Sequence, residues 1–274
     1  MTIREGILWA KEKLMGVCQR PQFEAELLMA FHLQKERTYL VTHDNEQFFE
    51  IEAFRKLIHR RAQNEPYEYI VGSASFYDIY LDVERGVLIP RPETEILVDL
   101  VAEIIEKENI THMVEIGIGS GAISIVLARK FNHLSIIATD ISDTALRVAQ
   151  QNIDHFKLSE HIELRKSNLI DDVSESISLV VSNPPYIKKE ESLEENIIKY
   201  EPHEALFGGV VGDELLKKII LDVKHKNIKY LACEMGYDQK ESMLEFIDHV
   251  GVKSATFYKD LSGLDRGFIV QFYA

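Results

Sequence analysis

Four consecutive residues, Asn183-Pro184-Pro185-Tyr186, carry the most informative chemistry in this sequence. They follow an apolar run at 177–182 that predicts a buried strand. Neither proline has a backbone N–H, so sheet pairing cannot continue through them, and the local carbonyl oxygens stay available. Open α/β sheets bind their ligands at the carboxyl ends of strands. An amide, free carbonyls and an aromatic ring at such an edge would suit the binding of a planar –NH2 group.

The chemistry that this motif suits is methylation of an amide or an exocyclic amine. Such a nitrogen is a poor nucleophile, so its N–H groups must be held by acceptors; the Asn183 side chain and the Pro184 carbonyl could supply two. Tyr186 could stack on the planar group, and its ring would favour a nearby cation. We expect Asn183, Pro184 and Tyr186 to be catalytic and Pro185 to contact the substrate as well. The alternative is a turn that only ends a strand.

A glycine-rich motif lies between a predicted strand and a predicted helix. Glycines permit a tight turn and a close backbone approach to a ligand, and the helix N-terminus offers free N–H groups. Asp140, at the end of the next predicted strand, could accept both hydroxyls of a ribose. The alternatives are a simple tight turn and, for Asp140, a helix N-cap. The residues expected to bind the cofactor here are Glu115, Gly117, Ile118, Gly119, Ser120, Gly121 and Asp140.

The glycine motif alone does not distinguish two cofactors. Gly117, Gly119 and Ala122 also fit the dinucleotide fingerprint. Glu115, however, would suit the amino group of a methionine moiety. In addition, the motif at 183–186 has no role in hydride transfer. We therefore expect S-adenosylmethionine as the cofactor.

The elements that must position these motifs fall into three predicted segments. Residues 1–70 show helical amphipathic stripes, with a helix expected to start at a capping-box-like pair, Asp44 and Gln47. Residues 71–90 predict a β-hairpin linker that turns at 84–86. Residues 91–274 alternate between strand and helix, which favours a Rossmann-like domain with a parallel sheet. Its last strands are expected at 229–233 and 267–272, with a helix between them.

Composition excludes several classes of protein. The formal net charge of -14 disfavours broad binding of nucleic acid. Cys18 and Cys233 show no zinc or CxxC spacing, and the ten histidines show no metal-ligand spacing, so no metal is expected. No signal peptide and no apolar run of membrane-spanning length is evident. These features predict a cytoplasmic protein.

The order and spacing of the motifs resemble the HemK/PrmC family of protein-glutamine N5-methyltransferases. The segment at 88–95, Leu-Ile-Pro-Arg-Pro-Glu-Thr-Glu, is the specific part of this resemblance. Residues 115–121, 140, 183–186 and 201–209 match in order, and residues 65–72 look similar as well.

This resemblance implies a class I S-adenosylmethionine-dependent methyltransferase fold, with a seven-stranded, mostly parallel sheet and a small N-terminal helical domain that docks the substrate. The substrate would be the glutamine in the Gly-Gly-Gln motif of class 1 peptide chain release factors. Asn183 would contact both cofactor and glutamine. Asn168 would lie beside the adenine, although the local sequence departs from the family pattern. Arg91 and Thr94 either line the substrate pocket or cap the following helix.

Three other functions stay open at this point. An amino-methyltransferase acting on adenine or cytosine of DNA or RNA could use the same four residues on a flipped base. The acidic net charge of this chain and the absence of a separate basic recognition region argue against a nucleic-acid substrate. A non-catalytic S-adenosylmethionine sensor would not need an intact acceptor motif. A dehydrogenase would leave that motif without a role.

Overall fold

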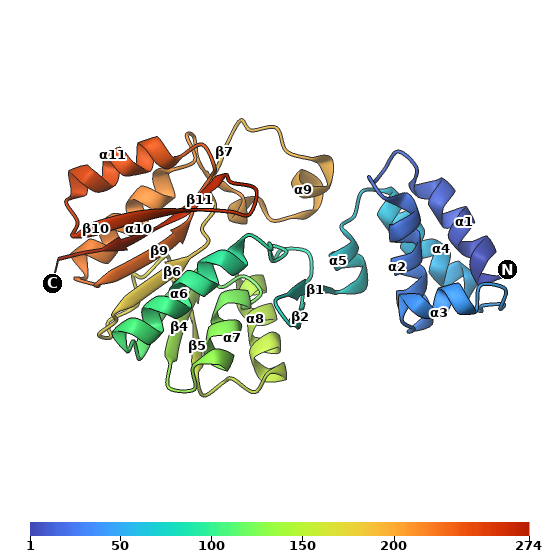
Figure 1. Cartoon of the computed structure of the whole chain (residues 1–274), viewed down its shortest axis with the longest axis horizontal. Coiled ribbons are helices and arrows are strands. Elements are labelled where there is room, and N and C mark those ends of the chain that lie inside the picture. Colours follow the sequence, from blue (N-terminus) through green and yellow to red (C-terminus); the bar gives the residue numbers. More distant parts are fainter. Residues whose placement is uncertain (274) are drawn as a thin grey trace. The chain divides into compact units, whose positions relative to one another are not determined.

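The computed structural model describes residues 1–273 of the chain (Figure 1). These residues form two compact units. The first comprises residues 1–73 together with 193–200, and the second comprises 74–192 and the described residues from 201 onward. The polar segment after the acceptor motif therefore contributes one short helix to the N-terminal unit.

The N-terminal unit is helical. Its helices are α1 (Ile3–Leu14), α2 (Pro21–Leu33), α3 (Arg37–Thr42), α4 (Ile51–Ala62), α5 (Tyr67–Val71) and α9 (Glu195–Tyr200). Apolar side chains on α1, α2 and α4 form its core, in which Leu14, Leu28 and Phe54 are fully buried. Thr2 and Glu5 form a reciprocal capping box that fixes the start of α1.

The expected capping box at Asp44 and Gln47 was wrong. Helix α4 begins at Ile51, after Glu50 in the left-handed conformation (φ 55°). Gln47 instead makes an isolated antiparallel bridge with Thr2. The spacing of the two side chains matched the motif, but the backbone between 43 and 50 is used to close the helical unit rather than to extend α4.

A seven-stranded sheet organises the second unit. Its strands, in spatial order, are β10 (Ser254–Lys259), β11 (Asp265–Gln271), β9 (Tyr230–Glu234), β6 (Leu179–Ser182), β3 (His112–Ile116), β4 (Ser135–Asp140) and β5 (Ile162–Lys166). β11 is antiparallel to both of its neighbours, and the other pairs are parallel. The expected seven-stranded, mostly parallel sheet is confirmed.

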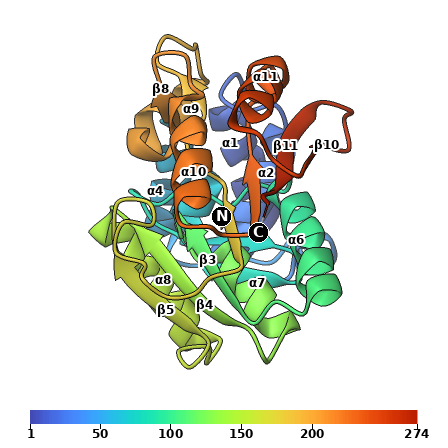
Figure 2. The same cartoon turned by 90° about the vertical axis from the view of Figure 1, so that its left-hand side faces the viewer.

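Helices cover both faces of this sheet (Figure 2). The helices are α6 (Thr94–Glu108), α7 (Ala122–Lys130), α8 (Asp143–His155), α10 (Glu214–His225) and α11 (Lys240–Val250). Successive strand residues point to opposite faces, so Met113 packs in the cluster with α6, α7 and α8, and Val114 packs in the cluster with α10 and α11. Burial on both faces explains the continuous apolar runs of the central strands.

Two short sheets complete the second unit, and one of them differs from the prediction. The hairpin of β1 (Ser73–Phe76) and β2 (Ile79–Asp82) turns at Tyr77 and Asp78, not at 84–86. Tyr77 adopts φ 51°, and Glu95 accepts its backbone N–H at 2.8 Å. This tertiary contact supports a turn that has no glycine. Strands β7 (Ile187–Lys188) and β8 (Phe207–Gly209) form the other pair, and a 3-10 helix covers His203–Ala205.

One strand of the large sheet was not expected from the sequence. β10 is an edge strand whose Ser-Ala-Thr-Phe-Tyr-Lys sequence has a weak apolar pattern, with only intermediate or exposed side chains. It pairs with β11 over residues 254–259. A sheet edge needs little burial, so the hydrophobic signal of such a strand is small.

Candidate functional site

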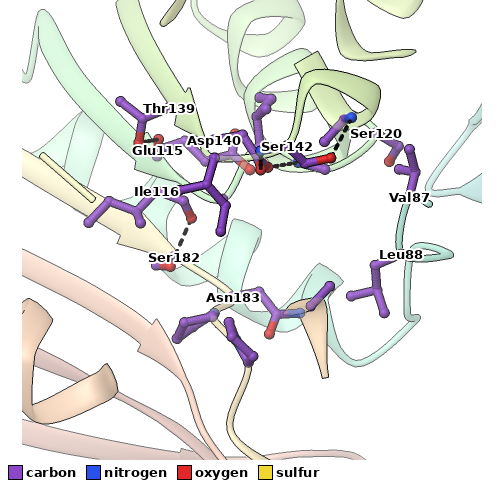
Figure 3. Close-up of a pocket in the computed structure, with 18 of the residues that line it drawn as sticks. Val87, Leu88, Glu115, Ile116, Ser120, Thr139, Asp140, Ser142, Ser182 and Asn183 are labelled. Carbon is purple, nitrogen blue, oxygen red and sulfur yellow. Dashed lines mark hydrogen bonds between the residues drawn. The ribbon is translucent and has the colours of Figure 1, made fainter. Parts of the chain in front are cut away.

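A cavity of about 340 Å³ opens at the carboxyl ends of β3, β4 and β6. This is the edge where the chain order reverses, because β3 pairs with β4 on one side and β6 on the other. Figure 3 shows Glu115, Asp140 and Ser142 on one side of the cavity and Asn183 on the other. The lining includes Val87, Leu88, Pro90, Arg91, Thr94, Glu115, Gly117, Ile118, Gly119, Ser120, Asp140, Ile141, Ser167, Asn168, Leu169, Asn183, Pro184, Pro185, Pro202 and Glu204.

The glycine loop forms one wall of this cavity. Gly117 and Gly119 have φ values of 76° and 54°, and a Cβ built on either residue meets no atom within 4 Å. Ligand atoms can therefore approach the backbone there. Gly121, with φ 90°, is the N-cap of α7. A Cβ at this position would lie only 2.9 Å from Cδ1 of Ile125. The loop thus provides the open backbone that a nucleoside-like cofactor needs.

Glu115 lines the cavity beside the glycine loop and is the last residue but one of β3. It is 1% exposed, and its Oε2 accepts the backbone N–H of Ser124 at 2.9 Å and the hydroxyl of the same residue. Burial raises the pKa of Glu115 to about 8, although the two hydrogen bonds oppose this shift. A cationic ammonium group beside it would favour the ionised form.

Asp140 ends the neighbouring strand, and its carboxylate is fixed from the protein side. Oδ1 accepts the N–H of Ser142 at 2.9 Å, and Oδ2 accepts the N–H of Gly119 at 3.2 Å. The N-cap of α8 is Ser142, whose Oγ accepts the N–H of Ala145 at 3.3 Å. The alternative role of Asp140 as the N-cap is therefore wrong. Burial raises its pKa, and the remaining carboxylate lone pairs are free for a diol.

The acceptor motif forms the opposite wall. The hydroxyl of Ser182 donates to the carbonyl of Ile116 at 2.8 Å, which ties the end of β6 to the glycine loop. Asn183 Nδ2 donates to Thr94 Oγ1 at 2.9 Å. Asn183, Pro184 and Pro185 line the cavity. This wall contains the amide and backbone oxygens that a planar –NH2 group requires.

Tyr186 faces away from this lining. Its ring packs in the core cluster beside α10 and α11, and its hydroxyl donates to Glu234 Oε1 at 3.1 Å. Burial raises the pKa of this hydroxyl. The tyrosine anchors the motif through these contacts, and its expected stacking on the substrate stays a prediction.

Arg91 and Thr94 both line the cavity. Arg91 donates to Glu201 Oε1 at 2.5 Å, and Glu201 Oε2 also accepts the N–H of Ile89 at 3.3 Å. Glu201 therefore joins the segment before α6 to the segment after the acceptor motif. The N-cap position of α6 is Glu93, without a side-chain cap, so neither Arg91 nor Thr94 caps the helix.

Asn168 lies on the rim, where the adenine contact was expected. Its side chain is exposed and donates to Asp171 Oδ2 at 3.1 Å. Leu169 beside it has φ 53°, and Ile141 after Asp140 is 57% exposed. Both apolar residues line the cavity.

Comparison with known proteins agrees with this site. Residues 5–72 match the model of the PrmC N-terminal domain, and residues 93–209 match that of the methyltransferase small domain. A release factor glutamine methyltransferase of Dictyoglomus turgidum is 40% identical, over 96% of both chains. Homologues of the same name from Clostridium botulinum and Coxiella burnetii are 36% and 31% identical, over 89% and 99% of this chain and 90% and 99% of theirs. The chain belongs to the release factor glutamine methyltransferase family.

Solved structures confirm the class I methyltransferase fold of this family member. The catalytic domain of hMettl16 in complex with MAT2A 3'UTR hairpin 6 superposes with a TM-score of 0.59 at 19% identity, covering 71% of this chain and 76% of that one. The N-terminal domain of human METTL16 in complex with SAH gives 0.54 at 21% identity, with the same coverage. At this level of identity the likeness concerns the fold alone.

The structure adds residues that sequence reasoning did not assign in this release factor glutamine methyltransferase homologue. Glu234 and Glu201 are buried carboxyl residues that hold the acceptor motif and its surroundings. Glu234 is the last residue of β9, as Asp140 is of β4, and Glu115 is the last residue but one of β3. A charged residue at the end of an apolar strand was the signal that could have found it.

Within 1–273, no three His, Cys, Asp or Glu side chains lie close enough together to hold a metal ion. None of the helices in the same range has the length and apolar character needed to cross a membrane.

Proposed function

We propose that this enzyme transfers a methyl group from S-adenosylmethionine to the side-chain amide nitrogen (N5) of the glutamine in the Gly-Gly-Gln motif of class 1 peptide chain release factors. One observation carries the proposal: the amide-binding wall at 183–185 faces a glycine loop across one cavity, in a chain that is 40% identical to a release factor glutamine methyltransferase.

The cavity fits the cofactor. Gly117 and Gly119 leave the backbone open, Asp140 offers carboxylate oxygens to ribose hydroxyls, and Glu115 offers a carboxylate to the methionine ammonium. Leu169 and Ile141 provide apolar surface for the adenine, with Asn168 on the rim. S-adenosylmethionine, when bound, supplies an electrophilic methyl group on a sulfonium.

The residues on the opposite wall prepare the nucleophile. Asn183 Oδ1 and the Pro184 carbonyl accept the two N–H groups of the glutamine amide, so that the nitrogen lone pair is directed toward the methyl group. Pro184 and Pro185 keep this part of the backbone out of the sheet. Holding the two reactants in line supplies much of the acceleration, so no general base is needed before transfer. The proton leaves the cationic product afterwards.

The N-terminal helical unit is proposed to dock the release factor. It forms a separate unit with its own core, and residues 5–72 match a family domain of their own. Because the proposed substrate works in translation, we place the reaction in the cytoplasm.

The test is to incubate the full-length protein with labelled S-adenosylmethionine and a folded release factor, and to map the modification by mass spectrometry. We expect one methyl group on the Gly-Gly-Gln glutamine, and none on a factor in which that glutamine is replaced by glutamate. Transfer to DNA or RNA, with the glutamine unmodified, would refute the proposal. The acidic net charge of -14 argues against that outcome.

Asn183→Ala gives a second test of the same site. Because the side-chain amide is proposed to hold the acceptor, its loss should lower kcat by about a hundredfold while the S-adenosylmethionine Kd changes only a few-fold. Equal loss of turnover and cofactor affinity would show that Asn183 serves mainly the cofactor.

A further inference from the structure

A chain of hydrogen bonds lies behind the acceptor motif. Asn183 Nδ2 donates to Thr94 Oγ1 at 2.9 Å, and the Thr94 hydroxyl donates to Glu234 Oε2 at 2.7 Å. The other carboxylate oxygen of Glu234 accepts the hydroxyl of Tyr186 at 3.1 Å. One carboxylate at the end of β9 therefore holds both ends of the Asn-Pro-Pro-Tyr motif, one directly and the other through Thr94.

The direction of these bonds follows from the number of protons available. A hydroxyl has a single proton, and the hydroxyls of Thr94 and Tyr186 both donate to the carboxyl oxygens of Glu234. Because Thr94 gives its proton to Glu234, its oxygen can only accept from Asn183. Asn183 must then turn its –NH2 toward Thr94, which leaves Oδ1 for the cavity. If the Thr94 proton were not held by Glu234, it could point to Oδ1 and the opposite amide orientation would become possible.

The Glu234 carboxyl is buried among hydrogen-bond donors and one nearby cation. The side chain is 1% exposed, and burial raises its pKa. The hydroxyls of Thr94 and Tyr186 and the positive charge of Arg266 oppose this shift, and Glu93 adds to it. Arg266 is itself held by Asp260, to which it donates at 2.7 and 3.2 Å. A buried carboxylate with two hydroxyl donors and a fixed cation nearby is built to accept hydrogen bonds.

We propose that Glu234 is a positioning residue: through Thr94 it orients the Asn183 amide so that Oδ1, and not the –NH2, faces the acceptor nitrogen. This inference rests on the proposed function, since only a substrate with N–H groups to be held needs an oxygen at that point. Glu234 itself is not among the residues that line the cavity, so it acts through Thr94 and not by direct contact.

The experiment compares three variants of the full-length enzyme under saturating S-adenosylmethionine with a folded release factor. Thr94→Val removes the hydroxyl but keeps the shape, Thr94→Ser keeps the hydroxyl, and Glu234→Gln leaves a single oxygen that cannot serve both Thr94 and Tyr186. For Thr94→Val and Glu234→Gln we expect kcat to fall by about tenfold or more, which corresponds to about 1.4 kcal/mol in the barrier. Thr94→Ser should stay within about threefold of the wild type.

The double variant Thr94→Val/Glu234→Gln tests whether the two residues act through the same series of hydrogen bonds. If Glu234 acts through Thr94, the combined variant should lose no more activity than the more impaired single variant, because coupled residues are not additive. The Kd for S-adenosylmethionine should stay within about twofold in every variant. The matched control is Asp213→Asn. Asp213 is also a buried carboxylate that accepts a hydroxyl, from Ser242 at 2.5 Å, but it lies at the start of α10.

The outcomes separate this inference from the proposed function. A wild-type enzyme that does not methylate the glutamine refutes the function. A wild-type enzyme that does, together with Thr94→Val folded and within about twofold of its kcat, refutes the orienting role. Additive losses in the double variant would refute it as well, because they would show that Glu234 and Thr94 act independently. A loss in Asp213→Asn as large as in Glu234→Gln would also refute it, because the effect would then be a general one of removing a buried carboxyl group.

Discussion

Replacement of Glu115 by glutamine should change the way in which the stability of the catalytic unit depends on pH. The carboxyl has an ordinary pKa of 4.5, and burial raises it to about 8 in the folded protein. The folded state therefore binds the proton more tightly than the unfolded state, so this group contributes a stability that is full below pH 4.5 and is lost as the pH rises toward 8. Glutamine keeps the shape and the acceptor for Ser124 but cannot ionise.

The magnitude follows from the pKa difference. A tenfold change in proton affinity corresponds to about 1.4 kcal/mol, so the complete shift has an upper bound of about 5 kcal/mol. About half of it falls within an accessible range: between about pH 5.5 and pH 7.5 the loss is about 2 to 3 kcal/mol for this one group. The wild-type protein should lose that amount relative to Glu115→Gln over the same interval, since all other titrating groups are common to both proteins.

Urea unfolding followed by far-UV circular dichroism measures this difference. The relevant transition is the one that S-adenosylmethionine moves to higher urea concentration, because a ligand stabilises the unit that binds it. Trp9, the single tryptophan, lies in the helical unit, so its fluorescence follows the other transition. If wild type and variant show the same pH dependence, Glu115 ionises like an exposed carboxyl, and the argument from burial is wrong.

Three further predictions concern the same cavity. Binding of S-adenosylmethionine at about pH 6.5 should release up to about one proton from the enzyme, because the ammonium group of the ligand would ionise Glu115. Calorimetry in buffers of different ionisation enthalpy measures the number of protons released. The Glu115→Gln variant should release none. Asp140→Ala should weaken S-adenosylmethionine binding by about ten- to a hundredfold in calorimetric titrations, because hydrogen bonds to a charged group contribute about 1.5–3 kcal/mol. The exposed neighbour Asp143→Ala is its control, and an equal loss there would contradict the ribose contact. Gly208→Ala would place a Cβ 2.5 Å from the carbonyl oxygen of Pro185 and 2.4 Å from that of Gly212, so kcat should fall with little change in cofactor Kd; unchanged turnover would show that the acceptor loop tolerates displacement.

The agreement between sequence and structure is closest where local pattern and burial coincide. The apolar runs at 112–116 and 177–182 predicted buried strands, and the structure has strands at 112–116 and 179–182 that are buried on both faces. The motifs that follow them were then placed at one sheet edge by topology alone. The hairpin turn at Tyr77 and the edge strand β10 escaped prediction, because a side chain distant in sequence supports the first and the second needs little burial.

The sequence by itself determined the chemistry of the site: a glycine loop after one strand, a carboxylate after the next, and an amide between a strand and two prolines. These are local facts, and strand ends bring them to one edge in any parallel sheet. Only the tertiary structure decided how the acceptor amide is held. Thr94, Asn183 and Glu234 come from three parts of the chain, and Thr94 and Glu234 stand 140 residues apart. The direction of a hydrogen bond depends on which donors and acceptors meet in space, and that information appears only when the sheet is assembled.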